Sequence, residues 1–89
     1  MKYIVRLNVF KKDFKRRLRQ GKDIEKLIRV IKLLAEGKNL DYKYRDHIPV
    51  GKFKSRHECH VEPDWLLIYG IDENNLILER TGSHSELFD

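Results

Sequence analysis

The sequence lacks the features on which several classes of protein depend. It has one cysteine, Cys59, so no disulfide can form within the chain, and a reducing compartment fits. No apolar run approaches the roughly 20 residues that a membrane-spanning helix needs. The first residues, MKYIVRLNVFKK, contain no apolar block of the kind found in signal peptides. We therefore expect a cytoplasmic protein.

Charge, by contrast, is abundant. Of the 89 residues, 37% are charged and 40% are hydrophobic, which is typical of a folded chain with a heavily charged surface. This length predicts a single domain, residues 1–89, with a modest core. The formal net charge of +5 indicates a polyanionic partner, either nucleic acid or an acidic protein. Charge alone does not separate this reading from that of an ordinary basic surface.

The beginning of the chain predicts a strand followed by a helix. Residues 2–7, KYIVRL, read as a short strand with apolar side chains on both faces. Phe10, Phe14 and Leu18 recur every fourth residue and mark one face of a helix, which we expect Asn8 to cap. The other face of this helix is strongly cationic. It carries Lys11, Lys12, Lys15, Arg16, Arg17 and Arg19.

A second helix follows after a short connection. Gly21 ends the first helix, Asp23 caps the second, and Gly37 ends the second. Because the connection is only a few residues long, the two helices form a hairpin. The apolar positions of the second helix are Ile24, Leu27, Ile28, Ile31 and Leu34.

The rest of the chain predicts a loop and an antiparallel sheet. Residues 38–53 have no helical period, and Pro49 and Gly51 favour a loop. Three strands follow, at about 54–61, 65–71 and 76–81. Their links are short, so consecutive strands pair antiparallel. Residues 83–88 read as a helical turn or a structured tail. The expected fold class is therefore α+β, with the helical hairpin covering one face of the sheet.

Titratable side chains gather at one end of this predicted sheet. The tight link after His60 brings it close to Asp64, and the final hairpin returns His84 to the same end. His47, in the preceding loop, can reach that end. If the turn at residues 72–75 sets the register, Arg80 lies opposite Leu67 and Gly82 opposite Trp65. The candidate site is His47, His60, Asp64, Arg80 and His84.

These residue types suit cleavage of RNA by its own 2′-hydroxyl. Imidazoles with unperturbed pKa values near ~6.5 exchange protons at neutral pH. One group removes the hydroxyl proton and another protonates the leaving 5′-oxygen. An arginine beside them binds phosphate oxygens and stabilises the charge that develops on phosphorus. This chemistry needs no metal, and we expect no cofactor.

Each candidate also has a simpler structural interpretation. His60 alone is more typical of an ordinary strand histidine, and His84 of a solvated tail residue. Arg80 has Glu79 and Glu58 as possible ion-pair partners, and Trp65 is more typical of a core. The cationic helix face is by default a solvated surface. Only the gathering of these residues after folding favours a site.

Two other chemistries are disfavoured by the strand period. A zinc site would draw on His57, Cys59, His60 and Asp64. However, Cys59 and His60 are adjacent on a strand and point to opposite faces. The chain contains neither of the usual C-x-x-C and H-E-x-x-H spacings. A nucleophilic role for Cys59 is disfavoured because its apolar, mid-strand surroundings favour a buried and inert thiol.

The segments HVEPDWLLIY and LERTGSHSELF together resemble the YafQ-like branch of the RelE/ParE toxin superfamily. The resemblance extends to FKKDFKR in the first helix and YRDHIPVGKF in the loop, and so covers nearly the whole chain. It implies a metal-independent mRNA endonuclease of a prokaryotic type II toxin–antitoxin pair. Such a toxin acts on mRNA in the ribosomal A site and is silenced by a small antitoxin protein.

The resemblance also assigns roles to particular positions. It implies catalytic positions for the candidate site residues given above, with Arg80 stabilising the phosphate and His84 acting as general acid or base. It makes Phe88 an aromatic side chain that packs against RNA bases, and it places Trp65 near the site. His57 stands where the family often has an arginine, while Arg56 faces the other side of the strand. One auxiliary phosphate contact is therefore in question.

We expect the remaining contacts with RNA to come from surface cations. They are Lys11, Lys12, Lys15, Arg16, Arg19, Lys52, Lys54 and Arg56. Two other functions stay open at this point. Toxins of the same fold bind DNA gyrase and cleave nothing, and a plain RNA- or partner-binding module would need no catalysis. The histidine cluster beside an arginine argues against the first. In the second, the residues of the cluster would be replaceable while binding survived.

Overall fold

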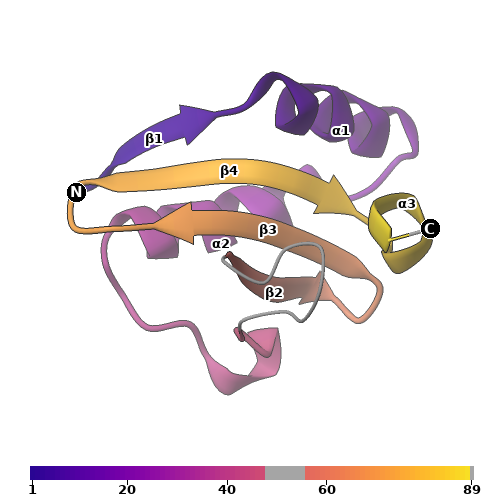
Figure 1. Cartoon of the computed structure of the whole chain (residues 1–89). Coiled ribbons are helices and arrows are strands. Elements are labelled where there is room, and N and C mark those ends of the chain that lie inside the picture. Colours follow the sequence, from indigo (N-terminus) through magenta and orange to yellow (C-terminus); the bar gives the residue numbers. More distant parts are fainter. Residues whose placement is uncertain (48–55, 89) are drawn as a thin grey trace.

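The computed structural model describes residues 1–47 and 56–88. Its elements in chain order are β1 (Tyr3–Arg6), α1 (Asn8–Arg19), α2 (Ile24–Ala35), the 3₁₀ turn η1 (Tyr42–Tyr44), β2 (His57–Glu62), β3 (Trp65–Ile71), β4 (Asn75–Gly82) and α3 (His84–Phe88) (Figure 1). This confirms the α+β class and the predicted order of elements. In the part of the chain that is described, no helix is long and apolar enough to cross a membrane.

Four strands form one mixed sheet in the order β1-β4-β3-β2. β4 pairs antiparallel with β3, and β3 with β2, as the short links predict. β1 pairs parallel with β4, which its separation along the chain allows. The side chains of β1 are exposed along the whole strand. β4 and β3 are therefore the interior strands, and they carry most of the buried hydrophobic residues of the sheet.

The ends of the two long helices follow the predicted signals, with one exception. The Asp23 side chain accepts a hydrogen bond from the Glu25 N–H and so caps α2. Gly21 and Gly37 follow the two helices with φ of +76° and +75°, where glycine carries no steric cost. The expected Asn8 cap is wrong. Asn8 is already the first helical residue, and Leu7 before it offers no capping side chain.

One face of the sheet packs against the helical hairpin. Leu67 and Cys59 from the strands lie in one buried cluster with Phe10 of α1 and with Leu27 and Val30 of α2. Burying side chains of this size stabilises the fold by about 1.5–3 kcal/mol each. The predicted covering of one face by the hairpin is therefore confirmed. We call this the core face. The expected apolar positions Leu18 and Ile28 are largely exposed, at 55% and 42%.

The opposite face is covered over part of its area by the tail. Leu87 of α3 is fully buried against Leu66 and Ile68, so the predicted docking of the tail on the core is confirmed. A Cβ atom at Gly82 would lie 2.9 Å from Glu86 Oε1 and 3.4 Å from Leu87 Cδ2. A side chain at position 82 would therefore displace the Glu86 carboxylate, which accepts the Ser83 N–H at 2.9 Å.

A bulge in β4 changes the predicted register. Near the turn, Tyr69 pairs with Leu78, as expected, but Ile68 then pairs with Arg80, and Glu79 is the extra residue. The expected pairings of Arg80 with Leu67 and of Gly82 with Trp65 are therefore wrong by one position. Without the bulge, Arg80 would point into the core face. With it, Arg80 shares the face of Leu66 and Ile68.

Candidate active site

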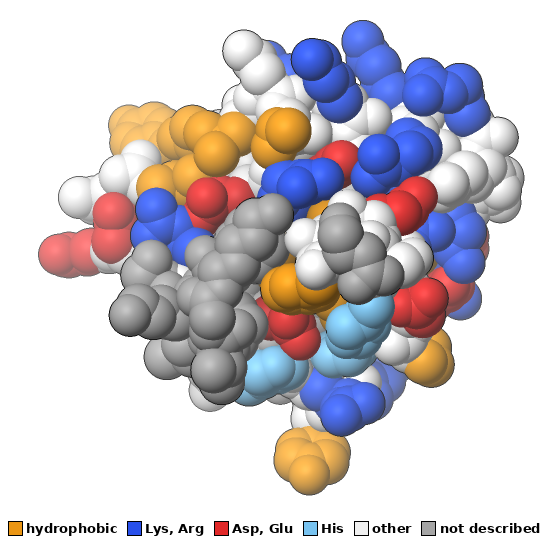
Figure 2. Space-filling model, turned by 45° about the vertical axis from the view of Figure 1, so that its right-hand side comes forward, with side chains coloured by type: hydrophobic (Ala, Val, Ile, Leu, Met, Phe, Trp, Pro, Cys, Tyr) orange, Lys and Arg blue, Asp and Glu red, His pale blue; other side chains and the backbone are white. Residues whose placement is uncertain are grey.

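Three strands bring polar side chains together on the face opposite the core. Glu58 of β2 pairs with Ile68, and Ile68 pairs with Arg80 of β4. Two positions along β2, His60 pairs with Leu66. Because paired residues share a face, Glu58, His60 and Arg80 all project from the same side of the sheet. We call this side the catalytic face, after the role that the sequence predicts for His60 and Arg80. Figure 2 shows histidine and acidic side chains gathered on it, with lysines and arginines around them.

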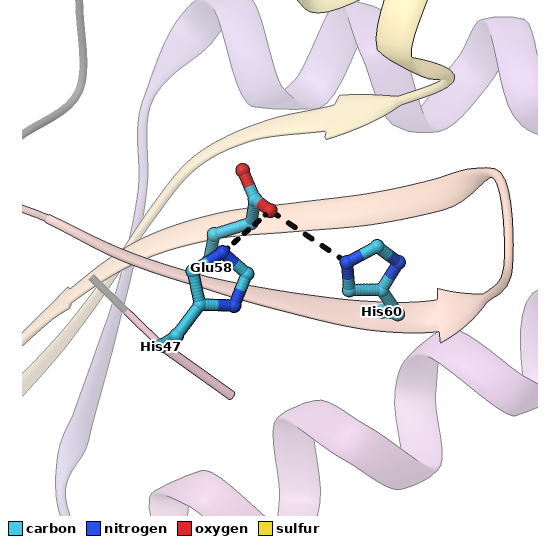
Figure 3. Close-up of side chains that lie close together, drawn as sticks. All are labelled: His47, Glu58 and His60. Atoms are coloured by element: carbon cyan, nitrogen blue, oxygen red, sulfur yellow. Dashed lines mark ion pairs between the residues drawn. The ribbon is translucent and has the colours of Figure 1, made fainter. Parts of the chain in front are cut away.

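His47, Glu58 and His60 lie together on this face, with Glu58 and His60 buried and His47 at the surface (Figure 3). We call these three residues the Glu58 cluster. His47 and Glu58 exchange two backbone hydrogen bonds, with N···O distances of 2.8 and 2.6 Å, and these fix the loop against β2. The Oε2 atom of Glu58 lies 3.0 Å from Nε2 of His47 and 3.6 Å from Nε2 of His60. Glu58 and His60 are each only 6% exposed.

The hydrogen bonds of the two imidazoles determine where their protons lie. Nδ1 of His47 is 2.7 Å from the Arg45 carbonyl oxygen, and Nδ1 of His60 is 3.2 Å from that of Pro63. A carbonyl oxygen only accepts, so both Nδ1 atoms carry a proton, and both Nε2 atoms face Glu58. An ionised carboxylate also only accepts. At least one further proton must therefore lie between Glu58 and the two rings.

The same three residues also form the donor set that could hold a metal ion. One ligand atom from each lies within 4.8 Å of the other two. This set differs from the one considered from the sequence. Cys59 is fully buried on the core face, where burial raises the pKa of its thiol, and its predicted inertness agrees with this. His57 stacks on Tyr69, with 5.2 Å between the ring centroids, away from Glu58.

Asp64 and His84 form the exposed part of the catalytic face, which we call the Asp64–His84 pair. Oδ1 of Asp64 accepts the backbone N–H of His84 at 2.9 Å and lies 3.0 Å from Nδ1 of the same residue. The backbone hydrogen bond, and next the ring, lower the pKa of Asp64, so the carboxylate is ionised at neutral pH. The His84 ring lies 5.9 Å from that of His60 and 6.0 Å from that of Phe88.

Arg80 is held from behind by a carboxylate that sequence reasoning missed. Asp13 of α1, only 2% exposed, lies 2.7 Å from Arg80 Nε and 3.2 Å from one of its terminal nitrogens. It also accepts the Thr81 N–H at 3.1 Å and a hydrogen bond from Arg16 at 3.0 Å. The hydrogen bond with Asp13 raises the pKa of Arg80 above its usual range. The only available signal was that Asp13 is the single acid in α1.

Glu58 was also missing from the predicted site. It lies two residues from His60 on one strand, so the period of a strand already places both side chains on one face. That spacing is the signal that the sequence offers, and the interpretation of Glu58 as an ion-pair partner of Arg80 makes no use of it. The five predicted residues His47, His60, Asp64, Arg80 and His84 do lie on one side of the sheet or its end, as the contacts above show.

The residues predicted to contact RNA differ in their exposure to solvent. Trp65 is fully buried, donates from Nε1 to Thr81 at 2.9 Å, and lies beneath Arg17 and Lys22. Its buried side chain agrees with the interpretation of Trp65 as a core residue, and it is not placed to contact RNA in this structure. Phe88 is 38% exposed beside His84, as predicted. Tail and helix are linked, because Arg16 Nε lies 3.2 Å from Glu86 Oε2.

The remaining predicted cations fall into three groups. Four are exposed along α1: Lys11, Lys12, Lys15 and Arg19. Arg56 is half-buried and forms an ion pair with Glu79, the extra residue of the bulge. Lys52 and Lys54 lie outside the described residues. Arg17, counted among the cations of the solvated helix face, is instead 7% exposed and packs over Trp65.

Comparisons with known proteins agree with this geometry. A family model described as a bacterial toxin of type II toxin–antitoxin systems, YafQ, matches residues 2–89. The chain is 40% identical over 80 residues to the mRNA interferase toxin YafQ of Escherichia coli K12, covering 89% of this chain and 87% of the relative.

Solved structures give the same result. A chain of the E. coli DinJ–YafQ complex superposes with a TM-score of 0.92 and 37% identity, over 100% of both chains. A metal-bound toxin from Helicobacter pylori superposes with a TM-score of 0.91 and 44% identity, covering 99% of this chain and 100% of the other.

Proposed function

The chain belongs to the YafQ family of bacterial toxins from type II toxin–antitoxin systems, and from that premise we propose how its catalytic face cuts RNA. It is an endoribonuclease of the mRNA interferase class. We assign the cleavage to residues 1–89 acting as one toxin domain. The reaction is attack of a ribose 2′-oxygen on the neighbouring phosphorus, with departure of the 5′-oxygen.

The Glu58 cluster accepts the proton of the 2′-hydroxyl. Its two imidazoles and one carboxylate hold a shared proton, with Glu58 and His60 buried. His47 is the ring at the surface, with 47% of its side chain exposed, and it therefore meets the hydroxyl. It accepts the proton at Nε2 when the shared proton lies between Glu58 and His60. A proton gained at His47 is stabilised at once by Glu58.

His84 supplies the proton that the leaving 5′-oxygen needs. The ionised Asp64 carboxylate lies 3.0 Å from Nδ1 and stabilises the positively charged ring, as the carboxylate of a catalytic triad does. That contact leaves Nε2 for the substrate. The rings of His47 and His84 each lie about 6 Å from that of His60, with centroid distances of 6.1 and 5.9 Å. A base and an acid separated in this way suit in-line displacement at phosphorus.

Arg80 stabilises the phosphate as negative charge builds on its oxygens. Two of its nitrogens are committed to Asp13, which fixes the plane of the guanidinium. The other N–H groups remain for phosphate oxygens, and such charge-assisted hydrogen bonds are among the strongest that a protein makes. The raised pKa keeps this side chain charged throughout. No step requires a metal ion.

The substrate is mRNA on the ribosome, in the cytoplasm. The exposed cations of α1 bind ribosomal RNA, because phosphate contacts give affinity without reading sequence. Phe88 stacks on an unpaired base beside His84. The net charge of +5 equally favours an acidic antitoxin as the cognate partner. That antitoxin covers the basic face of α1 or displaces the tail.

The observation that carries this proposal is the contact of three histidines with two carboxylates on one face. The test is single-turnover cleavage of an mRNA in the presence and absence of ribosomes. We expect cleavage only with ribosomes, because the ribosome holds the 2′-hydroxyl in line. Arrest of translation with every mRNA intact would contradict the proposal. So would efficient cutting of free RNA at low enzyme.

A further inference from the structure

A second cationic site adjoins the catalytic face and was not among the predicted residues. A pocket of about 380 Å³ lies between α2, η1 and the end of β2, with His60 in its wall. Its other walls carry Lys26 and Arg29 from α2, and Lys43 and Arg45 from and just after η1. Its volume falls within the range of small-ligand sites. Because His60 belongs to both, the pocket and the catalytic face are continuous.

The pocket carries excess positive charge. Glu62 is its one acidic lining residue, and this carboxylate is already engaged by Lys22 at 2.7 Å and Lys26 at 2.8 Å. These two lysines lower the pKa of Glu62, so it remains ionised and neutralises Lys26 rather than the others. Among residues 1–47 and 56–88, Arg29, Lys43 and Arg45 have no acidic partner within 4.0 Å. Their charge is therefore available for an anion.

The local backbone explains why these cations converge. Lys26 and Arg29 are three residues apart on α2 and so share one side of the helix. Arg45, with a φ of +50°, ends η1 in the left-handed region and redirects the chain. Its carbonyl then orients the His47 ring at 2.7 Å, while its side chain lines the pocket. The segment that aims His47 therefore also builds the pocket.

We propose that this pocket holds a backbone phosphate of the RNA strand adjacent to the scissile linkage. The inference rests on the proposed ribonuclease function and names a second point of contact for its substrate. Arginine presents a fork of N–H groups that matches phosphate oxygens, and Lys43 adds a point charge. Tyr44, whose ring lies 5.2 Å from the Lys43 ammonium, offers an aromatic edge for the neighbouring nucleoside. With Arg80 on the scissile phosphate and the pocket on an adjacent one, two fixed points set the direction of the RNA strand through the site.

The test compares two charge-matched double variants. Arg29→Gln/Lys43→Gln removes two cations of the pocket. Lys32→Gln/Lys38→Gln removes two cations that do not line it, one on α2 and one just after it. Ribosome-dependent cleavage is measured on synthetic mRNAs in which one linkage flanking the cleavage site is an uncharged methylphosphonate. Thermal unfolding of both variants checks that each is folded.

On unmodified mRNA, we expect the pocket variant to raise KM on the order of 10-fold and the control to change it little. The pocket variant should also show a shallower salt dependence of binding, by about 0.7 per lost contact for a single strand. With the correct linkage neutralised, wild type should weaken and the difference between it and the pocket variant should vanish. That loss of difference identifies the phosphate that the pocket holds.

Two results would overturn the inference while leaving the ribonuclease function intact. In one, the pocket variant cleaves like the control. In the other, its defect stays the same whichever linkage is neutralised, which would assign the cations to ribosomal RNA or to a general field. If wild-type protein cuts none of the mRNAs on ribosomes, the proposed function itself fails and this inference falls with it.

Discussion

The Glu58 cluster and the Asp64–His84 pair are built from the same residue types in opposite surroundings. In the Glu58 cluster, the carboxylate has a side chain only 8% exposed and faces two imidazoles. In the Asp64–His84 pair, the carboxylate side chain is 69% exposed and faces one ring that is 55% exposed. Water screens the carboxylate of the second pair, whereas it reaches the first site only at His47, whose side chain is 47% exposed. Burial alone thus gives two proton-carrying sites different properties.

The difference suits a reaction that needs a base and an acid at once. In the proposed mechanism, the group with the buried carboxylate acts as the base, because Glu58 stabilises a proton gained by either ring. An exposed pair is in exchange with solvent and is recharged after each turnover. The comparison predicts that variants of the exposed pair lose activity without losing stability. Variants of the buried group should differ from one another in stability, depending on whether they keep the hydrogen bonds of the group.

The largest effect is expected at the exposed pair. His84→Ala should slow single-turnover cleavage on ribosomes by about 10²–10⁴-fold, the usual contribution of a general acid or base. Because the ring is half-exposed, thermal unfolding and ribosome binding should stay close to wild type. Ser85→Ala, one residue along the same short helix, is the matched control and should cleave normally. Wild-type cleavage by His84→Ala would leave His47 and His60 as the only acid–base pair.

A smaller loss is expected when the buried carboxylate is replaced by its amide. Glu58→Gln should reduce cleavage by about 10²-fold, because the site no longer holds the proton that the carboxylate shared with the rings. Stability should change by less than about 1 kcal/mol, since the amide N–H groups can donate to both Nε2 atoms. Glu58→Ala leaves those atoms without a partner, so it should lose cleavage and stability together. Equal melting of the two variants, measured by calorimetry, would contradict this account.

The helices and strands that carry these sites were largely predictable from the sequence. The face of the sheet on which each side chain of β4 lies was not. The period of apolar residues located both helices, and the turn at residues 72–75 set the register of β4 correctly up to Leu78. Beyond it, the bulge at Glu79 depends on tertiary contacts. Asp13 of α1 binds the Thr81 N–H and the Arg80 side chain, and Arg56 pairs with Glu79 itself. No local signal in β4 encodes those partners.

The burial of two charged side chains, Asp13 and Arg17, was the other feature that could not be predicted from the sequence. An aspartate among lysines and arginines is normally solvated, yet Asp13 is buried because Arg80 and Arg16 converge on it. Arg17 is similarly removed from solvent by the indole of Trp65. Each burial depends on a partner more than 45 residues away in the chain, and periodicity within a helix carries no information about it.

A moderate effect is expected at the aromatic ring next to the exposed pair. Phe88→Ala should weaken productive binding by about 1–3 kcal/mol, the contribution of one base stacked on an aromatic ring. Phe88→Trp keeps a stacking surface and should restore most of it. Phe88→Leu keeps apolar area without a flat ring and should not. KM and kcat for ribosome-dependent cleavage, measured separately, distinguish these outcomes. Equal rescue by leucine would assign Phe88 to packing of the tail.

The smallest effect concerns the pH dependence of stability at the exposed carboxylate. Hydrogen bonds from the His84 backbone and ring lower the pKa of folded Asp64 below its unfolded value of about 3.9. The stabilisation is therefore present above pH ~4 and is lost as the pH falls through the folded pKa. Asp64→Asn should be less stable than wild type at neutral pH by a small amount, because the group is exposed and screened. This difference in stability between Asp64→Asn and wild type should disappear in acid.

Unfolding by urea between pH 3 and pH 7 measures that gap directly. Glu25→Gln is a suitable control, because the Glu25 side chain has no hydrogen bond or ion pair within the described residues, and its difference from wild type should vary little with pH. His84→Ala should abolish part of the same dependence, since the ring supplies one of the two hydrogen bonds to Asp64. A stability gap for Asp64→Asn that stays constant, or widens in acid, would mean that Asp64 is not held in its ionised form by His84. The proton donor of the proposed mechanism would then lack its carboxylate partner.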